Sequence, residues 1–149
     1  MADRAGSGAG SGAGTGPDDI GRGPGRVLIL VYGVFALSAG ARAGVQIATK
    51  WHEAPVAYAL SALAAAIYLV ALAGLVRGGR TGRLVALTAI GVELAGVLVV
   101  GTLSLLMPAA FPDATVWSDY GSGYGYVPLV LPMIGLWWLY RHRPRPARP

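Results

Sequence analysis

The sequence predicts an all-α integral membrane protein, a four-helix bundle of membrane spans that follows a flexible Gly-rich tail. Two observations lead to this prediction. The 149-residue chain is 54% hydrophobic and only 13% charged, whereas a typical soluble domain is about 25% charged. Its apolar residues form long blocks, and arginines separate these blocks. The chain contains no cysteine, which excludes disulfides, thiol catalysis and thiolate metal sites.

The two ends of the chain differ from the apolar blocks between them. Residues 1–26 are rich in glycine, serine and alanine, and the sequence GSGAG occurs there twice. Such a segment cannot bury enough apolar surface to offset its ordering entropy, so we expect a disordered cytoplasmic tail. Residues 141–149, RHRPRPARP, form a basic, proline-rich tail that we also expect in the cytoplasm.

The region between the tails, residues 27–140, is predicted to be one domain of four transmembrane helices. A helix needs about 20 apolar residues to cross a bilayer. The predicted spans are residues 27–49, 56–76, 84–107 and 121–140. The last apolar run, YVPLVLPMIGLWWLY, is short for a span, so either the preceding GSGYG completes it or other helices cover its end.

A cleaved signal peptide is a second interpretation of the first apolar block. Its core would be VLILVYGVFAL, followed by small residues that suit a cleavage site. The long leader before this core and the apolar run that continues after it both favour a retained membrane helix instead.

The distribution of basic residues indicates the orientation of the spans. Arginines before the first span, between the second and third spans and after the fourth all fall on one side of a four-span chain. The other side has Lys50 and an acidic loop, residues 108–125. Because cytoplasmic loops are enriched in Lys and Arg, we expect a multi-pass plasma membrane protein with both termini in the cytoplasm.

The expected partners follow from this orientation. The lipid bilayer surrounds the spans, and the arginines attract anionic lipids at the cytoplasmic face. Nucleic acid is not expected as a partner, because binding it would require a folded reader or a longer basic stretch.

Glu93 is the one acidic residue within the predicted spans. It lies about 15 Å into the third span, close to the bilayer midplane, by the rise of an α-helix. A charge at that depth costs about 3 kcal/mol, so we expect neighbouring helices to surround it. Arg42 of the first span is the candidate partner in an intramembrane polar pair, unless it extends outward to the headgroups. Ser38 and Gln46 form a polar stripe with Arg42 at a spacing of four residues.

Three interpretations of Glu93 remain open. It fixes the packing of the helices as a neutral or paired group, it is a protonatable site in an ion or substrate path, or it faces a partner subunit. Small residues flank both members of the predicted pair, Gly40 and Gly44 around Arg42, and Ala89 and Gly96 around Glu93. These small faces predict that the first and third spans pack closely on each other.

The outer loop is the most distinctive exposed stretch, and its candidate binding residues are Asp113, Trp117, Asp119 and Tyr120. We interpret it as an aromatic loop that rests at the level of the headgroups, with a ligand-binding cap as the alternative. No metal site and no cofactor are expected, because the spacing of the outer histidine and acidic residues does not force them together.

Three segments within residues 27–140, VYGVFALSAGAR, GVELAGVLVVGTLS and FPDATVWSDYGSGYGYVPLVLP, resemble uncharacterised small four-span integral membrane proteins of actinobacteria. The resemblance implies the topology and the membrane location, and it transfers no activity and no site residue.

The function expected from these features is that of a non-enzymatic membrane protein. It would act through helix packing, as a homo-oligomer or as an accessory subunit of a membrane assembly. The alternative is a small ion- or proton-coupled transporter that uses Glu93 with Arg42. No catalytic residue is expected, because the sequence offers no nucleophile–base pair.

Overall fold

The computed structural model describes residues 23–143, and it confirms the all-α fold. The α-helices are α1 (Pro24–Lys50), α2 (Pro55–Arg77), α3 (Gly79–Leu106) and α4 (Val127–Arg141), and the short 3-10 segments η2 (Pro108–Ala110) and η3 (Ser118–Tyr124) lie between α3 and α4. α1 begins before the predicted first span, at a proline that suits the first turn of a helix. Most of the predicted Gly-rich tail and of the basic tail lies outside the described residues.

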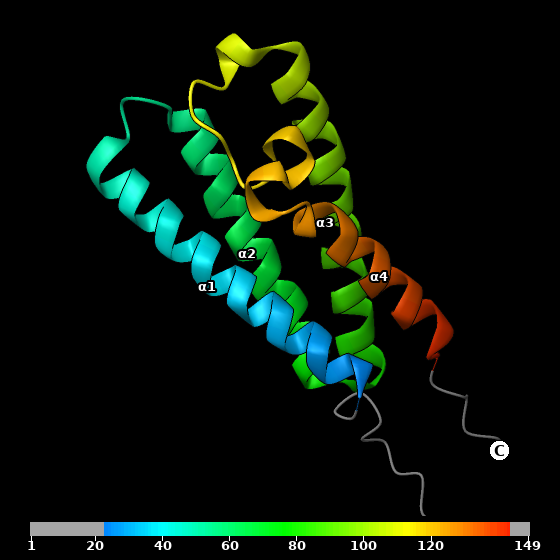
Figure 1. Ribbon diagram of the computed structural model, residues 1–149. Coiled ribbons are helices and arrows are strands. Elements are labelled where there is room, and N and C mark those ends of the chain that lie inside the picture. Colours follow the sequence, from blue (N-terminus) through cyan, green and yellow to red (C-terminus); the bar gives the residue numbers. More distant parts are fainter. Residues whose placement is uncertain (1–22, 144–149) are drawn as a thin grey trace, which may run out of the picture.

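The helices pack in the order of the chain. α1 lies along α2, α2 lies along α3, and α3 lies along both α4 and η3 (Figure 1). The start of α1, the α2–α3 turn and the end of α4 share one end of the bundle (Figure 1). We call it the arginine end, because Arg26, Arg77, Arg80, Arg83 and Arg141 lie there. The opposite end, with the α1–α2 turn and η2, is called the loop end.

Small side chains line the helix contacts, and large aliphatic side chains face outward. The second half of α1 buries Ala36, Ala39 and Ala43, whereas Leu37 on the same helix is 76% exposed. A soluble core would show large aliphatic residues inside. Helices in lipid instead pack through small residues, because large apolar side chains are equally well placed against acyl chains.

The α2–α3 turn brings two helix backbones close together. Gly78 has a φ of 61°, a left-handed conformation that glycine adopts at no steric cost, so α3 begins directly after α2 ends. A Cβ atom on Gly74 would lie 2.6 Å from the backbone nitrogen of Ala86. Of the small residues in the predicted contact, Gly40 faces Ala65 of α2, Gly44 has no neighbour within 4 Å and Gly96 lies against Trp117. The predicted packing of the first span on the third through small residues is therefore not observed.

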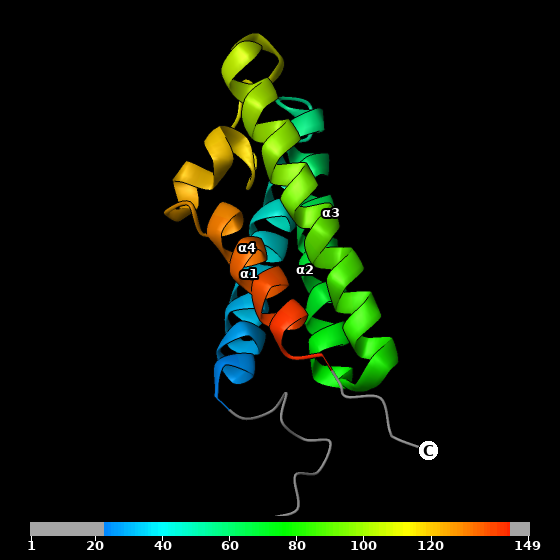
Figure 2. The same cartoon turned by 90° about the vertical axis from the view of Figure 1, so that its right-hand side faces the viewer.

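Within the described residues, α1, α2 and α3 are long and apolar enough to cross a membrane, whereas α4 has only 15 residues. A helix of that length extends about 22 Å, less than the roughly 30 Å of a hydrocarbon core. Residues 121–125 do not extend it, since they belong to η3 and the following turn. η3 packs beside α3 at the start of α4 (Figure 2).

Candidate functional site

Glu93 lies at the middle of α3 and is completely buried, with an exposed fraction of 0%. Its Oε2 atom accepts a hydrogen bond of 2.7 Å from the hydroxyl of Tyr32 in α1. Its Oε1 atom has no hydrogen-bond partner among the described residues. Neighbouring helices thus surround the carboxyl group, and one of its two oxygens is left free.

Arg42 has a different partner from the one that the sequence suggested. It is exposed, and its Nη1 donates a hydrogen bond of 3.2 Å to the hydroxyl of Tyr124, over whose ring the guanidinium lies at 5.8 Å. Tyr32 reaches Glu93 instead, and Arg42 lies ten residues further along α1, which is about 15 Å in an α-helix. The predicted Glu93–Arg42 pair is therefore replaced by a Tyr32–Glu93 hydrogen bond.

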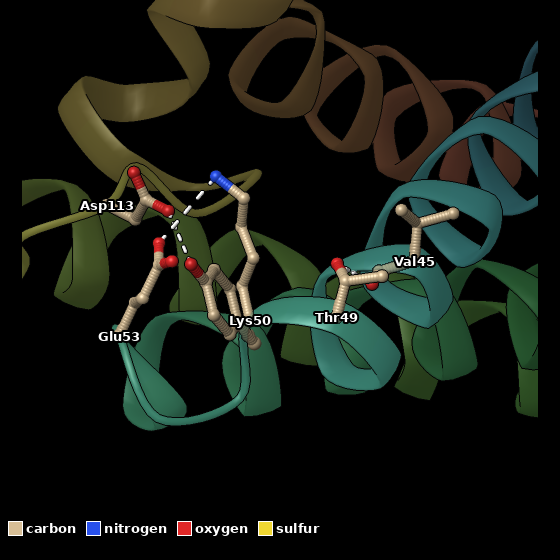
Figure 3. Close-up of polar contacts among 6 residues, drawn as sticks. Val45, Thr49, Lys50, Glu53 and Asp113 are labelled. Carbon is tan, nitrogen blue, oxygen red and sulfur yellow. Dashed lines mark hydrogen bonds and ion pairs between the residues drawn. The ribbon is translucent and has the colours of Figure 1, made fainter.

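The rest of the predicted polar stripe does not reach Glu93 either. Ser38 is exposed, and Gln46 is half-buried with its Oε1 atom unpaired among the described residues. Thr49, on the same helix, donates to the carbonyl of Val45 at 2.7 Å (Figure 3). The stripe follows the loop-end half of α1, beyond the level of the buried acid.

A second buried tyrosine extends the polar site to α2. Tyr68 of α2 is fully buried, and its ring centroid lies 6.2 Å from that of Tyr32. Its hydroxyl accepts a hydrogen bond of 3.3 Å from the indole nitrogen of Trp117. The buried site therefore joins α1, α2, α3 and the loop before α4.

The side chain of Trp117 enters the bundle, which the sequence did not predict, and the headgroup level expected for the rest of the loop stays a prediction. Trp117 is only 2% exposed. A Cβ atom on Gly96 would lie 2.8 Å from the Trp117 ring, so the indole rests directly on the α3 backbone one turn from Glu93. The helices thus cover the Trp117 side chain of an irregular segment.

The residues after Trp117 hold the loop against α3. The backbone N–H of Asp119 donates to the Ser104 hydroxyl at 2.9 Å, and the Tyr120 hydroxyl is hydrogen-bonded to Thr102 at 2.9 Å. Asp119 and Tyr120 have φ values of 50° and 58°, a left-handed backbone conformation that residues other than glycine rarely adopt. Several side-chain contacts thus hold an unfavourable backbone conformation in place.

The loop end carries a smaller polar cluster of Lys50, Glu53, Tyr58 and Asp113. Figure 3 shows Asp113, from the loop before α4, beside Lys50 and Glu53. The Tyr58 hydroxyl donates to Asp113 at 2.6 Å, and Lys50 pairs with Glu53 at 3.6 Å. Because both members of the ion pair are exposed, it contributes at most about 1 kcal/mol. Among residues 23–143, no three His, Asp or Glu side chains gather as metal ligands would.

Sequence reasoning missed the two tyrosines. Tyr32 and Tyr68 are polar aromatic residues inside otherwise aliphatic spans, and a buried tyrosine hydroxyl usually finds a hydrogen-bond partner. That rule singles them out as candidates, although it does not say which group each would meet. Chemically, the site offers one carboxyl group, two phenols and an indole, which suits hydrogen bonding and proton binding.

Comparison of the sequence with protein-family models and with curated proteins, and of the fold with solved structures, finds no match.

Proposed function

We propose that this chain is a non-enzymatic integral membrane protein that acts by packing against an apolar transmembrane helix of another polypeptide, either a second copy or a larger assembly. The observation that carries the proposal is a groove of about 620 Å³ between α2 and α3. Its walls are apolar residues of the two helices, namely Leu63, Ala66, Ile67, Val70, Leu84, Val85, Ala89 and Val92, with one threonine, Thr88.

The chemistry of the groove selects its occupant. The hydroxyl of Thr88 already donates to the carbonyl of Leu84 at 2.9 Å, so its hydrogen is not available to a guest. A polar ligand would lose its hydration there without compensation, whereas an apolar helix loses nothing. The groove lies alongside helices that are long enough to cross a membrane, where such a partner would be found.

The test compares two alanine-to-tryptophan variants with the unmodified protein in lipid nanodiscs, by native mass spectrometry. Ala66→Trp fills the groove, and Ala41→Trp adds the same bulk to an exposed position of α1. We expect the unmodified protein and A41W to form a complex heavier than the 15.3 kDa chain. We expect A66W to lose its partner helix and to be detected as the single chain. A monomeric unmodified protein, or equal behaviour of the two variants, contradicts the proposal.

The orientation is part of the proposal, with the arginine end in the cytoplasm and the plasma membrane as the location. The gathering of arginines at the end that carries both described termini supports it. The topology and membrane location implied by the resemblance to small actinobacterial membrane proteins are also part of this proposal. A reporter that is active only in the cytoplasm, fused after the last residue, should be active; an inactive reporter on a stable fusion refutes the orientation.

A second candidate function, proton-coupled transport through Glu93, is favoured by the free Oε1 atom. A buried acceptor without a partner costs about 1–3 kcal/mol and calls for an explanation. Arg42 then has at most an indirect role, because its hydrogen bond is to Tyr124. Glu93→Gln in proteoliposomes should abolish proton-dependent uptake and leave the fold intact; unchanged uptake excludes this function.

A further inference from the structure

Glu93 has one free carboxyl oxygen deep inside the bundle. Glu93 is completely buried, and only one of its oxygens has a partner in the described part of the chain. Most buried polar atoms in proteins are hydrogen-bonded, so an unpaired carboxyl oxygen points to a guest that the protein itself does not supply.

The groups around Glu93 determine what kind of guest it takes. The titratable groups that face it are the phenols of Tyr32 from α1 and of Tyr68 from α2. α4 faces this region through Gly135, on which an added Cβ atom would lie 3.7 Å from the Tyr32 hydroxyl. The loop before α4 contributes Trp117. Hard cations need about six oxygen ligands, and this site presents far fewer. A proton carried by water needs only the free oxygen.

The arginine end is closed by packed helices. The backbones of α2 and α3 touch at Gly74 and Ala86, where there is no room even for a methyl group. Arg83 of α3 donates two hydrogen bonds, of 3.2 and 2.6 Å, to the carbonyl of Leu139 in α4. Water could pass beside α3 at this end only if α3 separated from α2 or from α4.

The loop end is closed by a single irregular segment. Trp117 lies on Gly96, one turn from Glu93, and its indole is held by one hydrogen bond to Tyr68. The Asp113–Tyr58 and Tyr124–Arg42 contacts tie this segment to α2 and α1, and the Asp119–Ser104 and Tyr120–Thr102 contacts tie it to α3, each through a side chain. Segments held by a few side-chain contacts open at a lower free energy than packed helices do.

We propose that Glu93 takes up and releases a proton that water carries from the loop end, and that Trp117 closes this route in the present conformation. The proposal deepens the second candidate function and rests on the same carboxyl group. The two fail separately, because access to Glu93 can be measured in a protein that transports nothing.

The test uses the absence of cysteine from the chain, so that every introduced thiol is unique. Glu93→Cys is reconstituted in liposomes and treated with a small, charged thiol reagent that does not cross membranes, from either side in turn. His52→Cys in the α1–α2 turn and Arg80→Cys, both exposed, identify the sides of the loop end and the arginine end. Leu98→Cys, exposed on the outer face of α3, is the control for a thiol in lipid.

We expect the cysteine at position 93 to react from the loop end, and Trp117→Ala to accelerate that reaction at least tenfold. Trp137→Ala, which removes an exposed indole from α4, should leave the rate unchanged. Reaction from the arginine end, reaction as slow as that of Leu98→Cys in both backgrounds, or equal effects of the two tryptophan variants overturns the proposal.

A second measurement covers the case in which Glu93→Cys fails to fold. The native carboxyl group is then coupled to a hydrophilic amine with a water-soluble carbodiimide added at the loop end, and the peptide that contains Glu93 is analysed by mass spectrometry. Exposed Glu53 is the internal positive control. Labelling of Glu93 that increases in Trp117→Ala supports the route, and labelling of Glu53 alone in both backgrounds refutes it.

Discussion

Removal of the Tyr32 hydroxyl should destabilise the bundle, because it takes away the one hydrogen bond that Glu93 accepts. In Tyr32→Phe both oxygens of a completely buried carboxyl group lack a partner in the described part of the chain. An unpaired buried polar group costs about 1–3 kcal/mol. Hydrogen bonds between membrane helices average about 0.6 kcal/mol and reach about 1.7 kcal/mol. We therefore expect a loss of about 1–2 kcal/mol in the free energy of unfolding.

The double-mutant cycle with Glu93→Leu tests the reason for this loss. Glu93→Leu alone leaves the Tyr32 hydroxyl buried without its acceptor, so it also costs about 1–3 kcal/mol. In the double variant both partners are apolar. Its loss of unfolding free energy should therefore be smaller than the sum of the two single losses, by about 1 kcal/mol.

The assay is denaturant-induced unfolding in one detergent, followed by circular dichroism of the helices. Tyr126→Phe is the matched control, because Tyr126 is 53% exposed and its hydroxyl group is not buried in the bundle. Additivity of Tyr32→Phe and Glu93→Leu within about 0.5 kcal/mol would refute the reasoning. So would an equal loss of stability in Tyr126→Phe.

Two further predictions concern the packing and the partner of Arg42. Gly74→Ala should lower the free energy of unfolding by about 1–3 kcal/mol or more, since its Cβ would collide with the backbone of α3. Gly91→Ala is the control and should be neutral or stabilising, because no described atom lies within 4 Å of its Cβ. Equal melting temperatures of the two variants would count against the described helix contact. Arg42→Leu and Glu93→Leu should be additive within about 0.5 kcal/mol, because the two side chains do not share a contact; a larger coupling in the same unfolding assay would restore the ion pair that the sequence suggested.

Local composition predicted the helices well. The apolar blocks between arginines are each long enough for a helix, and α1, α2 and α3 cover the first three predicted spans with small shifts at their ends. The prolines at the starts of α1 and α2 mark helix beginnings that are visible in the sequence. These features depend on residues near one another in the chain, which is why a sequence reveals them.

The fourth span was predicted less accurately. Its apolar run was visibly short, but whether residues 121–125 extend the helix or turn away from it depends on what packs beside them. Gly101 of α3 leaves room for Tyr120, whose atoms lie within 3 Å of the position of a Cβ there. That contact joins segments from different helices, and spacing along the chain does not encode it in a readable form.

The sequence by itself determined that this chain forms apolar helices, that small residues mediate their contacts and that one carboxyl group lies deep among them. Only the tertiary structure decided which groups surround that carboxyl. Arg42 carries the opposite charge, but Tyr32 is the residue that the packing of α1 on α2 brings to the level of Glu93. Charge complementarity is read from residue types, whereas the height and rotation of each helix follow from all of its contacts at once.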